Sequence, residues 1–564
     1  MSGLAAYRKS WFFLLTFCML TFTFIGQAQY KHCKLLVDSS VTLINGHSNA
    51  AMVRGGDTIC LKKGIKTFLL LSYMHGTKTD PIIIQNADGL VTITGGSNYG
   101  VKFDSCSYIK LSGTGISALQ HGIKIDQFIG AGLSVDGLST DIEIEGLEIG
   151  NVGLAGIFAK TDPNCSFTST RDKYTLRNLS IHDNYIHHTG MEGMYIGSSK
   201  YAGQVITCGG RDTTVLPHLL KGVKVYRNLV QEAGWDGIQV SSTDSACTIH
   251  DNVILNDSKL AITYQMSGIL IGGGTNASVF NNRITDGLGD GIDVISFGKQ
   301  YIYNNLIINP GKAYKPTQNY TPWLKHGIYV GPEYTSPGNS CMIVFNTIIS
   351  PKSYGVRFTD NQSTGNVIAN NIIVDPGSYQ TLQEQAYINL SPATIDVTLF
   401  KNLTTRDINY PGFLDPGLKI FDLKSTSPAV NNALPVAGFD LSYDHINRPR
   451  PFAVSYDIGA YECSDSSLLD TPEHGNLTDL KLVISPNPFT DQCDVAYQLI
   501  HSTDITIRLL DDQGRMVMLR RSALQPPGKY QFIIYRESLK PGVYSLIFQT
   551  DYSAVTRKLI ILNN

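Results

Sequence analysis

The sequence predicts an all-β protein whose main body is a parallel β-helix solenoid, followed by a small C-terminal β-sandwich of the immunoglobulin-like kind. Three observations predict this fold class. A strand pattern recurs from about residue 55 to 400, no helical period separates its strands, and the last part of the chain contains alternating strands split by turn residues. At 564 residues the chain is also too long for one ordinary domain.

The recurring pattern is an alternating apolar strand that ends at Asn, then a second short apolar strand, then a Gly-Ile-x-Val strand. Clear copies are IHDNYIHHTGMEGMYIG (181–197), VYRNLVQEAGWDGIQVS (225–241) and VFNNRITDGLGDGIDVI (279–295). A repeat of this size with short strands is one coil of a solenoid, because a single coil cannot bury its own apolar face. A sheet with crossover helices would need helical patterns of roughly 10–15 residues between the strands, and the sequence has none there.

Stacked coils would place equivalent residues in columns about 4.8 Å apart. We expect the column Asn residues to adopt left-handed backbone at the turns and to stack their amides from coil to coil, which is a structural role. The Asn column contains Asn184, Asn228, Asn252, Asn282, Asn305, Asn346 and Asn371, and the Gly column contains Gly122, Gly156, Gly193, Gly237, Gly268, Gly291, Gly327 and Gly355.

These repeats resemble the parallel β-helix proteins of the pectin-lyase-like superfamily over roughly residues 40–460. RGGDTICLKKG (54–64) and GTKTDPIIIQN (76–86) look like the first coils of that group. The resemblance implies that the helix is right-handed. It implies no single reaction, because this fold carries hydrolases, lyases, epimerases and adhesins.

The N-terminus predicts export. Residues 1–28 have a charged start, an apolar stretch over 11–25 and small residues at 26–28, as a signal peptide does. The apolar stretch is shorter than the about 20 residues of a membrane span, and no later segment qualifies. We therefore expect a soluble monomer, secreted or attached to the outer-membrane surface, with a β-helix over residues 29–462.

Residues 425–462 resemble the closing segment of many bacterial surface β-helices, which ends in the same Asp-Ile-Gly-Ala-Tyr-Glu. We interpret this segment as a polar strap over the last coil, because an open solenoid end would expose apolar strands. Its charged residues Asp440, Asp444, Arg448 and Asp457 belong to the strap in this interpretation.

Residues 463–479 are polar and are predicted to be a linker. Residues 480–564 resemble the type A sorting domain of Bacteroidota type IX secretion, through SPNPF (485–489), ITIRLLDDQGRMV (505–517) and LKPGVYSLIF (539–548). The resemblance implies that the type IX secretion machinery is a partner of this domain.

The formal net charge of −2 shows no polybasic excess, which argues against a nucleic-acid partner. Nine of the ten cysteines remain after removal of the signal, and none has a spacing typical of zinc. Cys106, Cys247 and Cys341 each open an apolar strand and are expected to be buried. Cys165 and Cys208 lie in two polar insertions, where an oxidising compartment would allow a disulfide.

A strip of polar and aromatic residues is predicted beside the Gly column. Insertions at about 159–175, 198–220, 309–325 and 331–339 join the ends of the same strands and are placed to wall a groove. The residues just before the column Gly are Glu192, Asp236, Ser267, Asp290, His326 and Tyr354, and the outward residues two positions after it are Tyr195, Gln239, Leu270, Asp293, Tyr329 and Arg357.

Carboxylates in this strip are candidates for acid/base hydrolysis of a glycosidic bond. Glu192 and Asp236 would stand about 5 Å apart, near the separation of retaining enzymes, and Asp236 and Asp290 about 10 Å apart, slightly beyond that of inverting enzymes. Asp293 and His326 complete the candidate catalytic set. The alternative for each Asp is an ordinary solvated turn residue, because Asp before Gly is common in turns.

Substrate binding is predicted for the aromatic and polar residues that border the strip, since their rings need an amphipathic partner such as a sugar. These residues are Trp235, Tyr195, Gln239, Tyr329, Arg357 and Trp323.

The leading interpretation is a carbohydrate-active enzyme, a glycoside hydrolase that acts on an extracellular polysaccharide without a metal or cofactor. The second is a polysaccharide lyase, in which Ca²⁺ or Arg neutralises a uronate carboxylate and Lys325, His326 or Tyr329 serves as base. The third is a non-catalytic adhesin or glycan-binding solenoid.

Overall fold

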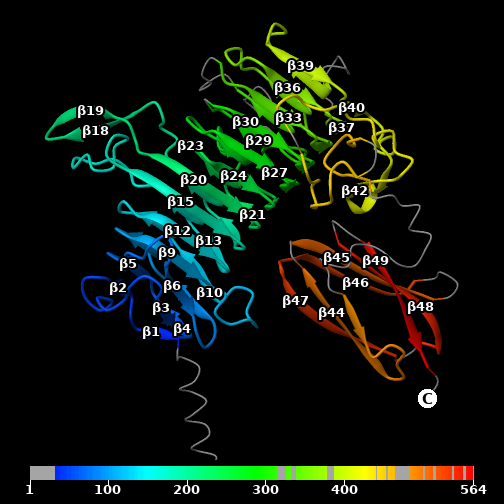
Figure 1. The fold of residues 1–564 in the computed structure, drawn as a ribbon, viewed down its shortest axis with the longest axis horizontal. Helices are drawn as coiled ribbons and strands as arrows, with labels where there is room; N and C mark the ends of the chain where they lie inside the picture. The colour runs from blue at the N-terminus through cyan, green and yellow to red at the C-terminus, as the bar shows by residue number, and fades with distance from the viewer. Residues whose placement is uncertain are drawn as a thin grey trace, which may run out of the picture.

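The computed structural model shows an all-β chain with a long parallel solenoid and a C-terminal unit of antiparallel strands (Figure 1). The predicted signal peptide and residues 464–479 of the predicted linker lie outside the described residues. No helix in the described part is long and apolar enough to cross a membrane. The structure describes residues 32–296, 298–315, 325–331, 338–377, 386–439, 441–452, 455–463, 482–499, 502–511, 516–536, 539–550 and 554–562.

Three parallel sheets form the walls of the solenoid, and successive coils add one strand to each sheet. Sheet A contains β1 (Cys33–Val37), β3 (Thr58–Leu61), β6 (Ile82–Asn86), β9 (Ser107–Ser112), β12 (Thr140–Glu145), β15 (Thr175–His182), β20 (Leu219–Tyr226), β24 (Cys247–His250), β27 (Ala277–Phe280), β30 (Gln300–Tyr303), β33 (Cys341–Val344), β36 (Asn366–Ala369) and β39 (Val397–Phe400), with β23 (Thr243–Ser245) beside β20.

Sheet C follows sheet A in each full coil. It contains β4 (Gly64–Lys66), β7 (Val91–Thr94), β10 (Ile123–Phe128), β13 (Leu147–Val152), β16 (Tyr185–Thr189), β21 (Leu229–Ala233), β25 (Val253–Leu255), β28 (Arg283–Thr285), β31 (Leu306–Ile308), β34 (Thr347–Ile349), β37 (Ile372–Val374) and β40 (Leu403–Thr405).

Sheet B carries the Gly-Ile-x-Val strands. It contains β2 (Leu43–Asn45), β5 (Leu69–Ser72), β8 (Tyr99–Asp104), β11 (Ala131–Asp136), β14 (Ile157–Ala159), β17 (Met194–Ile196), β22 (Ile238–Val240), β26 (Ser267–Ile271), β29 (Asp290–Val294), β32 (Ile328–Val330), β35 (Val356–Phe358) and β38 (Ile388–Leu390).

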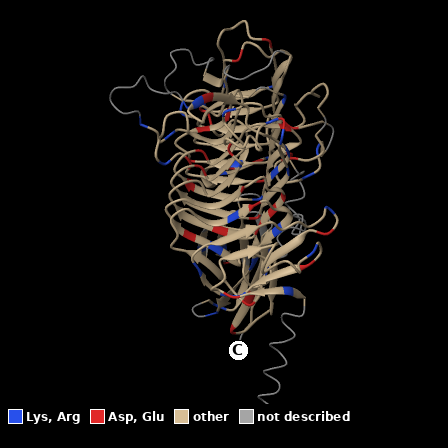
Figure 2. Ribbon diagram, turned by 90° about the vertical axis from the view of Figure 1, so that its left-hand side faces the viewer, with Lys and Arg blue, Asp and Glu red and all other residues tan. Residues whose placement is uncertain are grey.

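Period-2 alternation fills the interior of the solenoid. In β24, Cys247 and Ile249 are buried while Thr248 and His250 are partly exposed, because successive side chains point to opposite faces of a sheet. Aliphatic side chains from all three sheets form one apolar cluster that extends from Val37 to Ile395. Acidic and basic residues are interspersed along the coils (Figure 2).

The Asn column is present as a ladder of buried amides. Each Nδ2 donates to the Oδ1 of the next Asn, at 3.0 Å from Asn184 to Asn228 and at 2.9 Å from Asn371 to Asn402, which extends the predicted column by one coil. The expectation of left-handed backbone at these Asn residues is wrong, because the residue before each one takes it, as in Asp183 (φ 56°). That arrangement leaves the amide pointing along the stack.

The Gly column has a packing reason. A Cβ on Gly237 would lie 2.6 Å from the carbonyl oxygen of Gly268 and 2.7 Å from Cγ2 of Ile254. Both contacts are shorter than a side chain tolerates, so sheets B and C approach at this position only with Gly.

The cysteine predictions hold. Cys106, Cys247 and Cys341 are buried and free, and a disulfide joins Cys165 to Cys208 beside the projecting hairpin of β18 (Gln204–Cys208) and β19 (Arg211–Val215). A second disulfide, between Cys33 and Cys60, was not predicted.

The segment after the last coil reaches farther back than a strap over the solenoid end. It contains β41 (Phe413–Asp415), the 3-10 turn η1 (Pro416–Leu418) and β42 (Ile420–Leu423), and it packs a second apolar cluster against strands of sheet C and neighbouring corners. The Arg450 guanidinium donates to Glu462 (2.6 Å) and to Asn304 (2.8 Å), which lies several coils before the end. This segment therefore braces the side of the solenoid.

Three of the named strap residues have internal partners. Arg448 Nε donates to Asp444 Oδ2 at 2.8 Å, and Asp457 accepts from the backbone N–H groups of Asn431 and Cys463. These contacts agree with a structural role, while Asp440 lies outside the described residues.

The C-terminal unit consists of two facing antiparallel sheets around their own apolar cluster. One sheet contains β43 (Val483–Ser485), β44 (Gln492–Leu499) and β47 (Gly528–Tyr535), and the other contains β46 (Met516–Gln525), β45 (Thr503–Leu510), β48 (Gly542–Gln549) and β49 (Ala554–Ile561).

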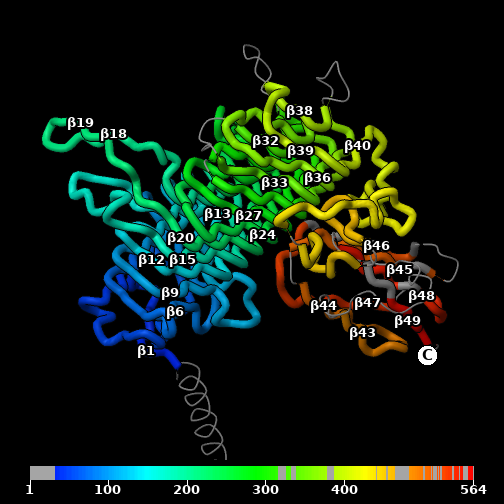
Figure 3. The backbone as a smooth tube through the Cα atoms, turned by 45° about the horizontal axis from the view of Figure 1, so that its top comes forward, coloured from blue at the N-terminus to red at the C-terminus, as the bar shows by residue number. Residues whose placement is uncertain are grey.

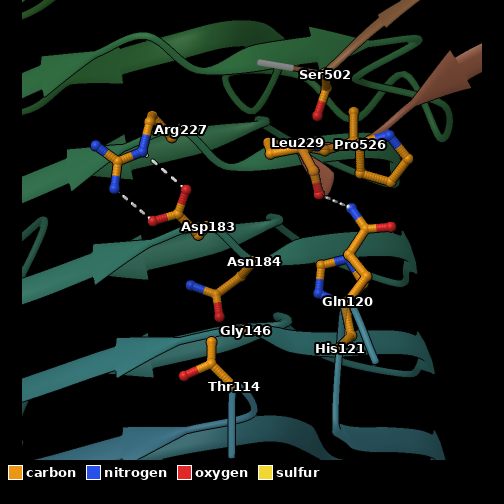
Figure 4. A pocket seen from close by; sticks show the side chains of 11 residues that line it. Thr114, Gln120, His121, Gly146, Asp183, Asn184, Arg227, Leu229, Ser502 and Pro526 are labelled. Atoms are coloured by element: carbon orange, nitrogen blue, oxygen red, sulfur yellow. Dashed lines mark hydrogen bonds and ion pairs between the residues drawn. The ribbon is translucent and has the colours of Figure 1, made fainter. Parts of the chain in front are cut away.

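The sandwich lies beside the solenoid rather than continuing it (Figure 3). Gln120 contacts it through a hydrogen bond to the Pro527 carbonyl (2.7 Å) and one from the Tyr530 hydroxyl (3.1 Å). A cavity of about 160 Å³ at this junction includes the Asp183–Arg227 ion pair in its lining (Figure 4).

Replacing a ladder Asn should destabilise the solenoid. Asn282→Ala removes the three hydrogen bonds that the Asn282 Nδ2 donates, which go to Ile249 O, Phe280 O and Asn305 Oδ1. It also deprives the buried Asn252 side-chain amide of its acceptor, Asn282 Oδ1. We expect the free energy of unfolding to fall by about 2–4 kcal/mol in chemical denaturation. Asn389→Ala, at a half-buried outward position of β38, is the control and should change it by less than about 0.5 kcal/mol. Equal losses in the two variants would contradict a structural ladder.

Candidate active site

Sheet B brings the predicted strip residues into two columns. Pairing of neighbouring strands places Tyr195 beside Gln239, then Leu270, Asp293, Tyr329 and Arg357. The second column consists of the residues that directly precede each column Gly, and it runs beside the first. Each column Gly donates its N–H to the carbonyl oxygen of the second-column residue on the next coil. These hydrogen bonds reach Asp236 O from Gly193 (3.0 Å), Ser267 O from Gly237 (2.9 Å), His326 O from Gly291 (2.9 Å) and Tyr354 O from Gly327 (3.0 Å).

Glu192 and Asp236 form a covered carboxyl pair at the N-terminal end of the strip. Both side chains are 0% exposed, and the Ser267 hydroxyl donates to Asp236 Oδ1 at 2.7 Å. Burial raises the pKa of Glu192 to about 7. Burial also raises the pKa of Asp236 well above its usual range, and the nearby Glu192 and Asp293 carboxylates add to that shift. The pair therefore favours its protonated form.

Asp290 is held in an ion pair at the middle of the strip. The Lys325 ammonium lies 3.1 Å from Asp290 Oδ2, and the backbone N–H of His326 donates to Oδ1 at 2.5 Å. Burial disfavours the charged Lys325, but the Asp290 carboxylate outweighs this effect and raises the pKa of the lysine. Asp290 thus fixes the backbone that carries His326.

His326, Tyr329 and Arg357 converge at the C-terminal end of the strip. The His326 ring centroid lies 5.7 Å from that of Tyr329 and 5.2 Å from that of Tyr354, over which the Arg357 guanidinium sits at 5.6 Å. Burial, then the charges of Arg357 and Lys325, lower the pKa of His326 well below its usual range. The imidazole is consequently neutral behind the half-buried Tyr329 and Arg357.

The remaining strip residues differ in accessibility. Asp293, Trp235 and Tyr195 are half-buried, and the Lys160 ammonium lies 4.8 Å from the Tyr195 ring centroid. Gln239 is 1% exposed, so it presents no surface to a ligand in this conformation. Trp323 lies outside the described residues, as do parts of the insertions expected to wall a groove.

Two residues of the cluster, Asp257 and Gln265, were not predicted from the sequence. Asp257 is 1% exposed, and burial raises its pKa to about 6. With its nitrogen toward the acids, the Gln265 amide donates to Asp236 Oδ2 (3.1 Å) and Glu192 Oε1 (3.2 Å). The sequence feature that could have pointed to them is the length of their coil. The step from Asn252 to Asn282 is 30 residues, whereas the step from Asn228 to Asn252 is 24.

In the described part of the chain, two groups of three side chains have ligand atoms close enough together to hold a metal ion. In the first group, Cys33 and Cys60 are joined by a disulfide. In the second group, the Lys110 ammonium lies 2.6 Å from the Glu143 carboxylate and 2.9 Å from the Glu145 carboxylate. Neither group belongs to the strip. The groups are His32, Cys33 and Cys60, and Glu143, Glu145 and His182.

Family models match both parts of the chain. The model of the right-handed β-helix region matches residues 130–307 and 221–391, and the model of the secretion system C-terminal sorting domain matches residues 483–562. No curated protein matches the sequence.

Solved structures with a similar arrangement share little sequence with this chain. An alginate lyase from Paenibacillus sp. str. FPU-7 is 15% identical, with a TM-score of 0.31, and the match covers 66% of this chain and 100% of that one. The pectate lyase Pel9A is 14% identical, with a TM-score of 0.37 and coverage of 77% and 97%. Tailspike protein 2 of bacteriophage CBA120 is 10% identical, with a TM-score of 0.37 and coverage of 90% and 72%.

These structural likenesses do not bear on the reaction. The family matches and the three parallel sheets do fix the class: the chain is a right-handed parallel β-helix protein with a C-terminal type IX sorting domain, and it is secreted or attached to the cell surface.

Proposed function

We propose that the protein is a carbohydrate-active enzyme that cleaves an acidic extracellular polysaccharide by β-elimination. The observation that carries the proposal is the convergence of a guanidinium, a phenol and a neutral imidazole on neighbouring coils of sheet B. Arg357 and Tyr329 are half-buried, so they face a ligand on the outside of the sheet.

The reaction assigns a role to each of the three groups. Arg357 pairs with the uronate carboxylate and stabilises the negative charge that develops when the proton on the adjacent carbon leaves. The Tyr329 phenol is the group at the surface: its oxygen takes the proton from the carbon as its own phenolic proton passes to the neutral His326 buried behind it, and His326 returns that proton at the end of the cycle. The bond from the neighbouring carbon to the glycosidic oxygen breaks, a carbon–carbon double bond forms, and the leaving oxygen takes a proton from Tyr329.

Hydrolysis by the predicted carboxylates has less support. A hydrolase needs one protonated and one ionised carboxyl in contact with the sugar. Glu192 and Asp236 are fully covered and both favour protonation, and Asp290 is engaged by Lys325. Asp293 is the accessible member of the predicted set, and it has no second accessible carboxylate beside it in its column of sheet B.

A panel of neutral and uronate-containing polysaccharides tests the proposal. Elimination predicts products that absorb ultraviolet light through their new double bond, from uronate polymers only. New reducing ends without that absorbance would indicate hydrolysis and overturn the proposal. Retention of a glycan with no product from any polymer would overturn it in favour of an adhesin.

Variants of the surface groups should lower the elimination rate. We expect Arg357→Ala and Tyr329→Phe each to reduce kcat/KM by roughly 100-fold or more, because each removes a group that acts on the transition state. The matched control is Tyr301→Phe, at a half-buried outward position of sheet A, which should leave kcat/KM unchanged. An active Tyr329→Phe enzyme would remove the phenol from the mechanism.

The Asp290–Lys325 pair should support the fold beneath these groups. Lys325→Met leaves the buried Asp290 without its cation, and we expect it to lower the free energy of unfolding by about 3–5 kcal/mol. The double variant Lys325→Met/Asp290→Asn should recover most of this loss, measured by chemical denaturation. Lys124→Met is the control, because its 2.7 Å pair with Glu148 is partly exposed and should contribute at most about 1 kcal/mol.

A further inference from the structure

We propose that residues 261–266 form a latch that closes over the Glu192 and Asp236 carboxyl pair through the Gln265 amide, and that the latch opens when the pair loses its protons. Its opening would make the N-terminal half of the strip accessible to a polysaccharide. The inference does not require the elimination reaction, since accessibility is measurable without substrate.

The latch is the outer part of an insertion between β25 and β26. Leu255 ends β25 and Ser267 begins β26, whereas four residues separate Ala233 and Ile238 one coil earlier. The inner part of the insertion is fixed, because the N–H groups of residues 258–260 donate to the carbonyls of residues 233–235 at 2.8–3.0 Å.

Met266 anchors the end of the latch, because it is 5% exposed and its carbonyl accepts from the Asp290 N–H at 2.9 Å. The part before it has less apolar burial, since Ile262 is 41% exposed and Tyr264 is 77% exposed. Gln265 instead turns inward and donates from one amide nitrogen to both Asp236 and Glu192. A single side chain thus joins the latch to the two carboxyls, which lie on neighbouring coils.

The closed arrangement leaves one carboxyl oxygen of the Glu192 and Asp236 pair unsatisfied. Within the described part of the chain, Glu192 Oε2 is buried and has no hydrogen-bond partner. An unpaired buried oxygen is costly, and an ionised carboxylate there costs more than a protonated one. Opening the latch would give this oxygen water, so ionisation and opening favour each other.

The charges around the pair act in the same direction. Asp293 and Asp257 lie near Asp236 and disfavour its ionised form, and Glu192 does the same. Lys160 is the cation that acts on Glu192, and Lys325 is engaged by Asp290. Loss of protons therefore accumulates negative charge beneath Gln265 with little compensation.

The direction of the pH effect follows from the Glu192 carboxyl. Burial raises its pKa from 4.5 to about 7 in the closed state, so the closed state binds this proton more tightly than the open state does. Closure is fully supported below about pH 4.5, and this support is lost as the pH rises through about 7. The difference corresponds to a change of at most roughly 300-fold in the equilibrium between closed and open forms.

Hydrogen exchange measured by mass spectrometry on the full chain tests the latch. The reporters are the amides of Ala261 and Gln265, which both donate backbone hydrogen bonds, whereas the amides of residues 258–260 in the fixed inner part should stay protected at both pH values. After correction for intrinsic rates, we expect at least a tenfold loss of protection from about pH 5 to about pH 8.5. Glu192→Gln should keep the segment protected at both pH values, because its side chain cannot ionise, and Gln265→Ala should expose it at both. Lys259→Ala, an exposed position on the same insertion, should retain the normal pH response.

Equal corrected protection of the unmodified protein at the two pH values would overturn the latch, as would a full pH response in Glu192→Gln. Asp236→Asn provides a second neutral variant if Glu192→Gln fails to fold, and its pH response should also be reduced. A working latch with no elimination product would leave this inference standing and remove the proposed function. Elimination product without a pH-dependent latch would overturn the latch and leave the proposed function standing.

Discussion

The register between successive coils is the constraint on which the rest of the structure depends. Parallel pairing fixes each strand against the next, and the buried amide ladder from Asn184 to Asn402 repeats one contact at each coil. A slip of one residue would turn every inward aliphatic side chain toward solvent and break the ladder at the same time. Exposure of the core and loss of the amide hydrogen bonds therefore both disfavour any other alignment of the coils.

That alignment converts residues far apart in sequence into one chemical surface. Asp290 and Lys325 are 35 residues apart, yet their side chains form a buried ion pair. Within one strip, the N-terminal end consists of covered carboxyls with raised pKa values and the C-terminal end of a guanidinium, a phenol and a neutral imidazole. Burial is the first cause of the shifted pKa values at both ends, and the cations Lys325 and Arg357 add to it at the C-terminal end.

The repeats alone were enough to predict the coils, the Asn and Gly columns and the membership of the strip, since these depend on period and register. Burial within the strip was not predictable. Gln239 occupies a position that faces outward by alternation and Glu192 directly precedes a column Gly, and both are covered in the structure. The left-handed residue before each column Asn escaped prediction as well, because Asp183, Arg227 and Phe345 share no residue type. The fold-back of residues 413–463 depends on long-range packing that no local pattern encodes.

The insertions, more than the repeats, decide what this solenoid can do. Where four residues connect sheet C to sheet B, as between Thr285 and Asp290, the coil closes with an ordinary turn. Where eleven residues connect Leu255 to Ser267, the added chain places an amide over two carboxyls and buries them. The same repeat position thus titrates differently from coil to coil, because the segment stacked above it sets its solvation. The regular coils fix the spacing between side chains. Each insertion sets the local dielectric around a carboxyl and thereby its pKa, which decides whether the group acts as an acid, as a base or as a pH-dependent switch.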